Sequence, residues 1–439
     1  MKGIQIQLFD DFDVCSPSLT EETNSTKRQA TKFSLMVRGL INMLKILCSI
    51  SISIINKKNI STNRRNLIGT LTSPSSLPTL PFDLIIEILS RLPVKQLLQL
   101  RCVCKSWKSL ISDPKFAKKH LALSTTYSLH GIGRNYYCPE LVLKSYSLNS
   151  SVSIAQIHLP LKGYVRVLGS CNGVLCLGEE EDGGDLFLVR LWNPSIRKFK
   201  ELPPVRKPHS YQLGMRGFGY NPISDNYKVV VVLLPSDDVE DNAEYTGNYF
   251  SNHEVKVHTL GTDSWKSFSV FPFAGLFVQE VGQYVSGTIN WLVYMDIMQG
   301  QCFIASLDLG DESYQKVLLP DDSGEVDQHT LDLSVFKDCL CLISREDVWV
   351  MKEYGNKESW TKLFTISYMR DHCTSSYYNI HPKYIFEDDR VLLRCCCCEG
   401  DVYYKYISYN CNCKNGTSKF IKVGYTLEVC IESLILLCF

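Results

Sequence analysis

The sequence predicts an α+β multidomain protein in which a small all-α bundle precedes a larger all-β propeller. Three observations predict this order. Apolar residues recur at helical spacing between residues 77 and 121. Beyond residue 125, short runs of alternating apolar and polar residues are separated by Gly, Asn, Asp and Pro. A pattern of strand, polar turn, aromatic residue and second strand then recurs along this region, as in repeat architectures.

Length and composition bound the possibilities. A chain of 439 residues exceeds what one core usually fills, so two domains with extensions are expected. Its 46 Lys and Arg balance 46 Asp and Glu, so no overall field directs it toward nucleic acid or an anionic membrane. The 19 cysteines fall mostly on apolar, strand-like segments, which indicates reduced core thiols and a cytoplasmic or nuclear location. The sequons at Asn24, Asn59, Asn149 and Asn415 are then expected to stay unmodified.

Residues 1–76 are expected to form a poorly ordered extension that contains an apolar segment, 33–55. Basic residues interrupt that segment, and its uninterrupted part, 46–55, spans only about 15 Å as a helix, half of a roughly 30 Å hydrocarbon core. A tilted membrane span over 37–55 stays open as the alternative. The polar, turn-rich stretch 61–79 predicts a linker and a domain boundary near residue 76.

The first helix of the bundle is predicted to begin at Pro81, because a proline at the first helical position loses no hydrogen bond. Asp83 and Glu87 then lie near the positive end of the helix dipole. The apolar residues that follow Pro81 form one stripe of a 3.6-residue period. They are Leu84, Ile85, Ile88, Leu89 and Leu92.

Pro93 ends this helix and opens a second, short one, and a third is predicted before Asp113 and Pro114. The apolar face of the second helix consists of Val94, Leu97, Leu98 and Leu100, and that of the third of Val103, Trp107, Leu110 and Ile111. Residues 77–121 therefore hold three or four helices, and so small a bundle barely covers its own core. Because burying a large apolar side chain is worth about 1.5–3 kcal/mol, leftover apolar faces favour a partner.

Five marker aromatics define the repeats of the β-domain. They lie 66, 49, 46 and 60 residues apart, near the kelch-like period of about 50 residues, and are Phe199, Trp265, Tyr314, Trp360 and Phe420. Dividing residues 125–439 by about 45–50 residues per blade gives about six or seven blades. We therefore expect an all-β, kelch-like propeller over residues 122–439.

The helical stretch closely resembles the F-box of the plant F-box and F-box-associated, kelch-type family, with Leu80-Pro81, 92–94 and 102–107 in place. The resemblance implies an F-box over residues 77–121 that docks on a Skp-type adaptor, and through it on a cullin and a RING protein. Many matching residues could equally form only the core of a small bundle. The motif positions associated with that contact or its support are Leu80, Pro81, Leu84, Ile85, Ile88, Leu89, Pro93, Val94, Leu97, Val103 and Trp107.

The β-domain resembles the F-box-associated domain of the same family at 169–177, 217–230, 287–292 and 350–364. Asn172-Gly173 suits a type I′ hairpin turn, and Gly217 and Gly219 permit close backbone approach. Asn290 departs from the family, whose members commonly carry His before the following Trp. These motifs identify architecture, so no substrate-binding residue is nominated.

No catalytic residue is expected, because phosphate-binding loops, nucleophile elbows, HExxH and kinase motifs are all missing from the sequence. Four cysteines could offer thiolates to zinc: Cys395, Cys398, Cys411 and Cys413. Residues around 399–401 are predicted to turn between two strands, however, which would aim Cys395 and Cys398 at opposite faces. We therefore expect no metal and no cofactor.

Charged surface runs are interpreted mainly as solvated. The basic residues of the bundle lack interleaved aromatic residues for bases, so no nucleic acid partner is expected. Acidic runs at 179–182, 237–241 and 321–327 are expected in loops between strands, where they could meet a basic target, although solvated turns are favoured.

These expectations combine into a non-catalytic substrate-recognition subunit of a Skp–cullin–F-box E3 ubiquitin ligase, in which the F-box holds the adaptor and the propeller presents a target protein. The alternative is a membrane-tethered or soluble protein-binding propeller that acts independently of the ligase. A propeller oxidase is a more distant alternative, because its copper site needs Tyr, His and Cys partners that the sequence does not reveal.

Overall fold

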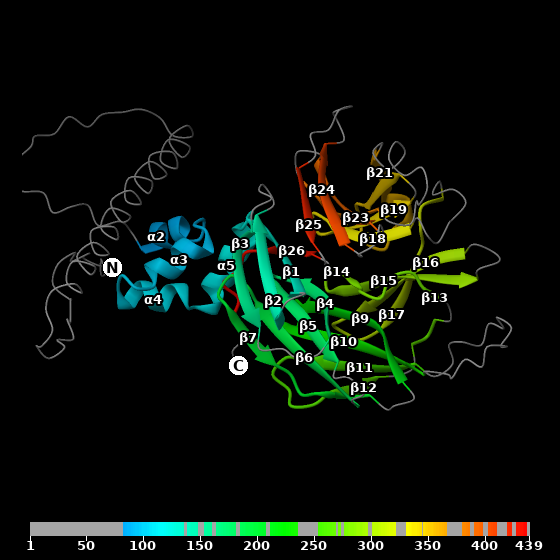
Figure 1. Cartoon of the computed structure of the whole chain (residues 1–439), viewed down its shortest axis with the longest axis horizontal. Helices are drawn as coiled ribbons and strands as arrows, with labels where there is room; N and C mark the ends of the chain where they lie inside the picture. The colour runs from blue at the N-terminus through cyan, green and yellow to red at the C-terminus, as the bar shows by residue number, and fades with distance from the viewer. Residues whose placement is uncertain are drawn as a thin grey trace, which may run out of the picture. The chain divides into compact units, whose positions relative to one another are not determined.

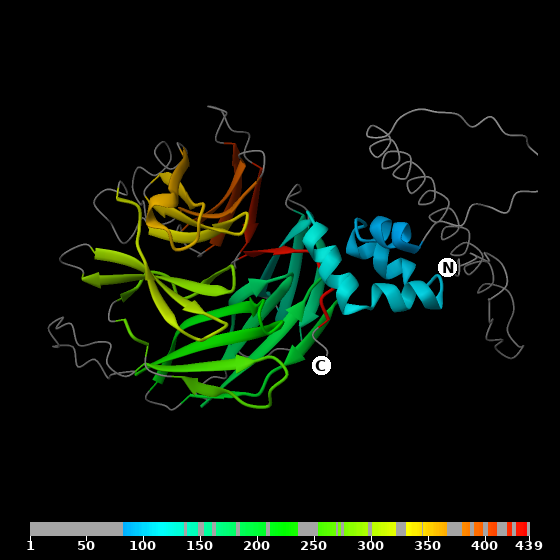
Figure 2. The same cartoon turned by 180° about the vertical axis from the view of Figure 1, so that it is seen from behind.

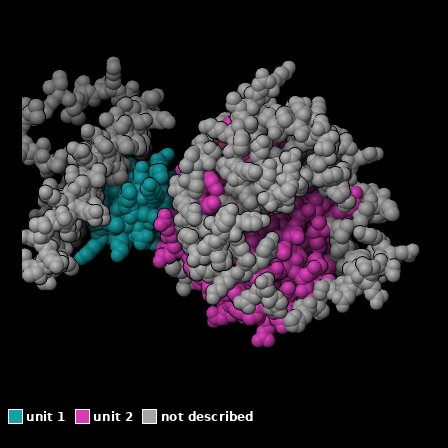
Figure 3. Space-filling model, in the orientation of Figure 1, with its two compact units in different colours: residues 1–123 teal, residues 124–439 magenta. Residues whose placement is uncertain are grey.

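The computed structural model of the chain divides into two compact units, residues 1–123 and 124–439, which are coloured separately in Figure 3. The structure describes residues 82–135, 138–147, 153–159, 164–180, 185–207, 211–235, 253–268, 271–273, 276–296, 301–321, 331–344, 346–366, 380–386, 390–397, 403–410, 419–423 and 427–436. The apolar segment 33–55 lies outside these residues. Within them, none of the helices has the length and apolar character that crossing a bilayer would need.

The described part of the first unit consists of four short helices, α2 (Phe82–Leu89), α3 (Val94–Leu100), α4 (Lys105–Ile111) and α5 (Pro114–Leu123). Asp113 explains the break between α4 and α5, because its carboxylate accepts the backbone N–H of Lys115 at 2.7 Å at the start of α5. The core of this unit contains Ile85, Ile88, Leu89, Leu92, Val94, Leu97, Leu100, Ile111, Phe116 and Ala117. The predicted apolar stripe is therefore largely the inner face of a helical bundle.

The described part of the second unit contains six antiparallel sheets, which we number as blades 1 to 6. From the innermost strand outward, blade 1 is β26 (Leu427–Ile431), β1 (Tyr127–Asn135), β2 (Cys138–Ser147) and β3 (Ser153–Leu159); blade 2 is β4 (Tyr164–Cys171), β5 (Val174–Glu180), β6 (Leu186–Asn193) and β7 (Lys198–Glu201), with β8 (Val205–Arg206) beside β6; and blade 3 is β9 (Tyr211–Asn221), β10 (Asn226–Pro235), β11 (Glu254–Thr259) and β12 (Lys266–Phe268).

The remaining blades follow the same order from the centre outward. Blade 4 is β13 (Leu276–Phe277) and β14 (Gln283–Val285), both paired with β15 (Thr288–Asp296), then β16 (Gln301–Asp308) and β17 (Tyr314–Val317); blade 5 is β18 (Leu331–Phe336), β19 (Cys339–Ser344), β20 (Asp347–Met351) and β21 (Trp360–Thr365), with the 3-10 turn η2 (Lys357–Ser359) before β21; and blade 6 is β22 (Ile380–Ile385), β23 (Arg390–Cys397), β24 (Tyr403–Asn410) and β25 (Lys419–Val423).

The innermost strands form a closed ring. Each lies beside the innermost strand of the next blade, in the order β26, β4, β9, β14, β18, β22 and back to β26, and Figures 1 and 2 show the sheets grouped around this shared centre. The ring is closed by the C-terminal strand, because β26 pairs with β1 and places Ile431 opposite Tyr127. The predicted order of a helical bundle followed by an all-β propeller is confirmed.

The marker aromatics have a common structural position at or directly before the outermost strand of blades 2 to 6. Trp265 donates its indole N–H to the carbonyl of Pro203 at 2.6 Å, and Trp360 donates to the carbonyl of Leu318 at 3.0 Å. Both carbonyls follow the outermost strand of the preceding blade. At these two tryptophan positions, the aromatic repeat therefore marks a contact that ties one blade to the one before it.

The glycine and turn predictions are confirmed. Asn172 and Gly173 have φ angles of 52° and 79°, the positive values that a type I′ turn requires, between β4 and β5. A Cβ at Gly217 would lie 2.5 Å from Ile289 Cγ2, and one at Gly219 would collide with the Tyr284 ring. These glycines allow blades 3 and 4 to pack closely.

Antiparallel pairing gives the propeller two different ends. At the hairpin end, the first strand of a blade turns into the second, at 172–173, 222–225, 286–287 and 337–338. The opposite, open end carries the connections from second to third strand and from one blade to the next. The two ends therefore draw on different segments of the sequence.

Candidate functional site

The structure separates the eleven predicted adaptor-binding residues into distinct groups. Leu80 and Pro81 lie outside the described residues. Leu84 and Trp107 are half-buried, and Pro93 is exposed, as is Val103 with 44% of its surface accessible. The five others are buried in the bundle core and can only support a contact: Ile85, Ile88, Leu89, Val94 and Leu97.

Two further apolar side chains of the helical unit are exposed and were not singled out from the sequence. Phe82 at the start of α2 is 40% exposed, and Leu123 at the end of α5 is 38% exposed. Phe82 directly precedes the apolar stripe of α2, so its position in the sequence could have identified it as a further candidate contact residue. Val103, which was predicted on the face of the third helix, lies instead in the turn between α3 and α4. Together with Val103, Phe82 and Leu123 are the strongly exposed large apolar groups in the described part of the helical unit.

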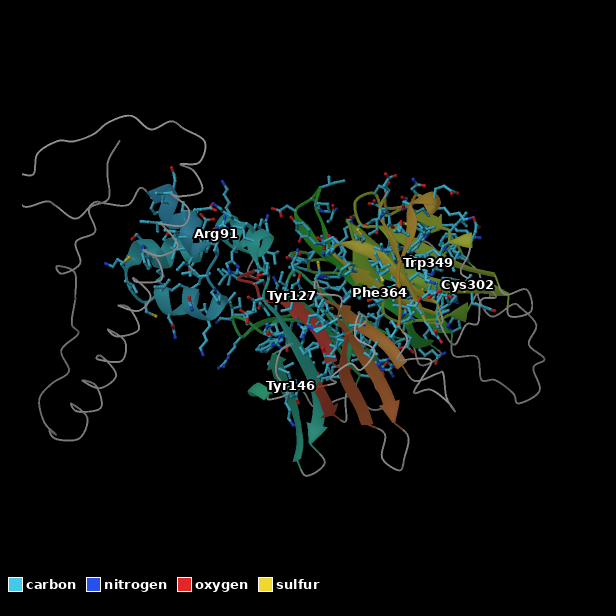
Figure 4. All side chains as sticks on the ribbon, turned by 90° about the horizontal axis from the view of Figure 1, so that it is seen from above. Arg91, Tyr127, Tyr146, Cys302, Trp349 and Phe364 are labelled. Atoms are coloured by element: carbon cyan, nitrogen blue, oxygen red, sulfur yellow. The ribbon has the colours of Figure 1, made fainter. Side chains whose placement is uncertain are left out.

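Polar contacts fasten α5 to the rest of the bundle. The Glu87 carboxylate accepts from Arg91 Nη2 at 2.5 Å and pairs with Lys119 Nζ at 3.0 Å, and the hydrogen bonds from Arg91 and Lys119 lower the pKa of Glu87. Arg91, labelled on the helical unit in Figure 4, is about half exposed while it makes this contact. The buried His120 ring lies 2.8 Å from the Leu92 carbonyl through Nε2, and burial lowers its pKa. These contacts hold α5 against the rest of the bundle and so fix the helices that carry the exposed apolar side chains.

At the hairpin end of the propeller, buried asparagines tie neighbouring blades together. Asn193 Nδ2 donates to the carbonyls of Ser433 and Ile435 at 3.2 and 3.0 Å, so blade 2 holds the segment that follows β26. Asn221 Nδ2 donates to the Leu309 carbonyl at 3.0 Å and so ties blade 3 to blade 4. These side chains stabilise the ring.

Asn290, the departure from the family pattern, belongs to the same class of contacts. Its Nδ2 donates to the Gln283 carbonyl at 3.1 Å and to Thr288 Oγ1 at 3.0 Å, and its Oδ1 accepts from the Tyr354 hydroxyl at 2.7 Å. Tyr354 belongs to the β20–β21 connection of blade 5. The fully buried Asn290 amide therefore links blades 4 and 5.

The cysteine region forms the predicted hairpin, since β23 pairs with β24 and places Cys397 opposite Tyr403. Cys398, Cys411 and Cys413 lie outside the described residues. Within the described part of the chain, no group of three or more His, Cys, Asp or Glu side chains could hold a metal ion. Burial raises the pKa of the Cys430 thiol to about 12, as expected for an inert core thiol.

The assignment of the acidic run 179–182 to a loop is wrong for its first two residues. Glu179 and Glu180 belong to β5. Glu179 can be buried because it pairs with Arg190, which also donates a hydrogen bond to Glu201. In the run 321–327, only Asp321 is described, and it pairs with Lys357. The run 237–241 lies outside the described residues.

Sequence reasoning nominated no residue of the β-domain for target binding, but the structure brings four charged residues together at the open end. They are Arg166, Glu180, Arg216 and Glu280. A signal was present in the sequence, because Arg166 lies between two valines near the start of an inner strand. A charge in such a strand is unusual unless it is paired.

Comparison with known proteins gives two family matches. A model described as an F-box domain matches residues 77–119, and one described as an F-box associated beta propeller domain matches residues 136–436. In Arabidopsis thaliana, F-box/kelch-repeat protein At3g23880 is 30% identical over 66% of this chain and 80% of its own length. F-box protein CPR1 of the same plant is 30% identical over 82% of this chain and 90% of its own length.

Proposed function

The chain belongs to the F-box proteins that carry an F-box-associated β-propeller, and on that premise we propose that it is the substrate-recognition subunit of a Skp–cullin–F-box ubiquitin ligase. The observation that carries the proposal is the joining of an F-box to a propeller in one chain. The F-box implies binding of a Skp-type adaptor, and the propeller implies binding of a target. The adaptor would in turn connect the chain to a cullin and a RING protein.

The exposure of motif residues supports the adaptor contact. Val103 is 44% exposed and Trp107 is half-buried, although both are large apolar side chains in a small bundle. Fully burying such a side chain against a partner is worth about 1.5–3 kcal/mol. A helical unit that leaves these groups in water gains from docking.

The proposed role assigns no chemistry to this chain. Ubiquitin transfer would arise because the target lysine is held close to a ubiquitin-loaded enzyme, which raises its effective concentration. Reduced, buried thiols such as Cys176 and Cys341 support a cytoplasmic or nuclear site of action. Fractionation of cells that express the tagged full chain tests this location.

A pull-down with a purified Skp-type adaptor tests the ligase assignment. The full chain with Val103→Asp and Trp107→Ala should lose adaptor binding by at least about tenfold, since a charge replaces an apolar contact at the interface. Leu123→Asp is the matched control, because Leu123 has similar exposure, 38%, but lies outside the motif positions. Circular dichroism of both variants shows whether the helices persist.

Failure of the intact chain to bind the adaptor, or equal binding by the double variant and the control, would refute the assignment. Substitution of Ile88 is unsuitable for this test, because its side chain is only 6% exposed and a charge there would unfold the bundle.

A further inference from the structure

Four charged side chains from three blades meet at the open end of the propeller. Arg216 in β9 and Glu280 just before β14 form the closest pair, with Arg216 Nη2 2.6 Å from Glu280 Oε2. Arg166 in β4 approaches the same carboxylate oxygen at 3.8 Å through Nη1, and Glu180 Oε2 at 3.7 Å through Nη2. One Glu280 oxygen is therefore shared by two guanidinium groups from adjacent blades.

The pairing of Arg216 is incomplete. Only 7% of its side chain is exposed, and burial lowers its pKa. Its buried Nε has no hydrogen-bond partner among the described residues, while 57% of the side chain of its partner Glu280 is exposed. Removing a charge from water costs several kcal/mol unless its hydrogen bonds are replaced, so stability alone does not favour this arrangement.

Arg190 in blade 2 shows how the same protein satisfies a guanidinium for stability. Its Nε donates to Glu201 Oε1 at 2.8 Å and its Nη1 donates to the buried Glu179 carboxylate. Arg190 is therefore hydrogen-bonded to two carboxylates. The contrast shows that Arg216, unlike Arg190, has a donor without a hydrogen-bond partner among the described residues.

The backbone beside Glu280 is fixed independently of its side chain. Arg216 N–H donates to the Glu280 carbonyl at 2.8 Å, and Gly282 N–H donates to the Arg216 carbonyl at 2.8 Å. The Glu280 carboxylate can therefore turn into solvent while the contact between β9 and the segment before β14 stays intact. Because 57% of the Glu280 side chain is already exposed, water would hydrate the displaced carboxylate, while an incoming carboxylate would take over the pairing with Arg216.

We propose that Arg166 and Arg216 bind an acidic side chain of the target protein in the place that the Glu280 carboxylate holds in the free propeller. The inference deepens the proposed function, on which the identification of the ligand as a target protein rests. Guanidinium groups suit this task because their planar donors match both oxygens of a carboxylate. Glu280 then acts as an internal competitor.

The test uses the full chain and two fluorescein-labelled peptides, hexaglutamate and hexalysine, with binding followed by fluorescence polarisation. The wild-type protein should bind hexaglutamate in preference to hexalysine, and added salt should weaken that binding. Arg166→Gln should raise the Kd for hexaglutamate by about fivefold, the effect of one partly exposed ion pair. Glu280→Gln should lower the Kd, because it removes the competitor.

Arg206→Gln is the control, since Arg206 is an exposed arginine of the same blade as Arg166 and belongs to β8. Its Kd should match the wild-type value. Arg216→Gln is left as a secondary variant, because the loss of a buried group can unfold the domain. Arg166 is 33% exposed, so its substitution tests the site without that risk.

The proposal is overturned if hexaglutamate does not bind, if it binds wild-type and Arg166→Gln proteins equally, or if hexalysine is preferred. The adaptor pull-down separates this failure from failure of the ligase assignment. Arg166→Gln should bind the adaptor as the wild type does. A chain that binds hexaglutamate through Arg166 but no adaptor would refute the ligase role and leave the anion site standing.

Discussion

The two ends of the propeller treat buried polar groups differently. At the hairpin end, Asn193, Asn221 and Asn290 are almost fully buried, and the amide of each donates hydrogen bonds to neighbouring segments. At the open end, Arg216 is similarly buried, yet its Nε has no hydrogen-bond partner among the residues that the structure describes, and its carboxylate partner faces solvent. Buried polar groups that are fully bonded help to specify a fold, whereas a buried charge with an unused donor beside an exposed partner needs an explanation, which the proposed anion site gives.

Arg216 and the three asparagines are all buried, so burial alone does not distinguish a residue that stabilises the ring from one proposed to bind a ligand. The useful measure is whether each buried donor and acceptor has a partner. By this measure, Asn193, Asn221 and Asn290 stabilise the ring, whereas the cluster around Glu280 is where we propose recognition. Substitutions at Gly173, His130 and Arg166 probe this contrast.

Gly173→Ala should cause the largest loss of stability. The added Cβ would lie 2.5 Å from the Ile431 carbonyl oxygen and from Ser433 Oγ, so it would push against the strand that closes the ring. Gly355→Ala is the matched control, because Gly355 has nearly the same φ, 81° against 79°, but no atom within 4 Å of the added Cβ. Both variants bear the left-handed strain of about 1–2 kcal/mol.

Only Gly173→Ala adds the steric clash, which should cost about 1–3 kcal/mol more. Chemical denaturation of both variants measures the difference in free energy of unfolding. Equal destabilisation of the two would show that the approach of β26 to the β4–β5 turn is not a tight contact.

Acidification should destabilise the propeller through His130, a buried residue of β1 whose Nδ1 lies 2.9 Å from Ser145 Oγ. Burial lowers the pKa of His130 from 6.5 to about 4. The folded state favours the neutral His130 ring. The resulting contribution to the free energy of unfolding is therefore fully present above pH 6.5 and is lost as the pH falls toward 4. The lowered pKa corresponds to a total of about 3 kcal/mol, as an order of magnitude.

Thermal unfolding from pH 7.5 to pH 4.5 checks this prediction in the wild type and in His130→Gln. The variant should lose less stability over the range, since its side chain does not titrate. Parallel pH profiles for the two proteins would instead assign the acid sensitivity to other groups, such as the buried His258.

Arg166→Gln should have the smallest effect on stability, within about 0.5 kcal/mol, because partly exposed ion pairs contribute little. Its effect should appear in ligand binding instead. Thermal melting of this variant beside Gly173→Ala therefore sharpens the division between the two ends. A large loss of stability in Arg166→Gln would assign the charged cluster to the fold.

Local signals in the sequence predicted local features well. The apolar stripe after Pro81 corresponds to α2, and Asn172-Gly173 forms the expected turn. The hairpin of β23 and β24 also matches its prediction. Each of these features depends on residues close together in the chain, where spacing and turn chemistry decide the outcome.

Features that depend on distant pairing were missed. Blade 1 combines β26 with β1, so neither part of the sequence shows the repeat seen in the other blades. Glu179 was misassigned because its partner Arg190 lies in the next strand and neutralises it there. The sequence marked Arg166 as a charge in an inner strand, but it could not show the partners of Arg166, since three blades must assemble before the charges around Glu280 meet.

Closure by β26 has a consequence for synthesis. The edge of β1 that pairs with β26 stays unpaired until the last strand leaves the ribosome, on the order of tens of seconds after β1 at about 5–20 residues per second. The contacts of Glu432 with Ser124 and Thr126 join the last segment to the first in the same event. During that interval the open edge can pair with another chain, so nascent molecules need protection that the finished ring does not.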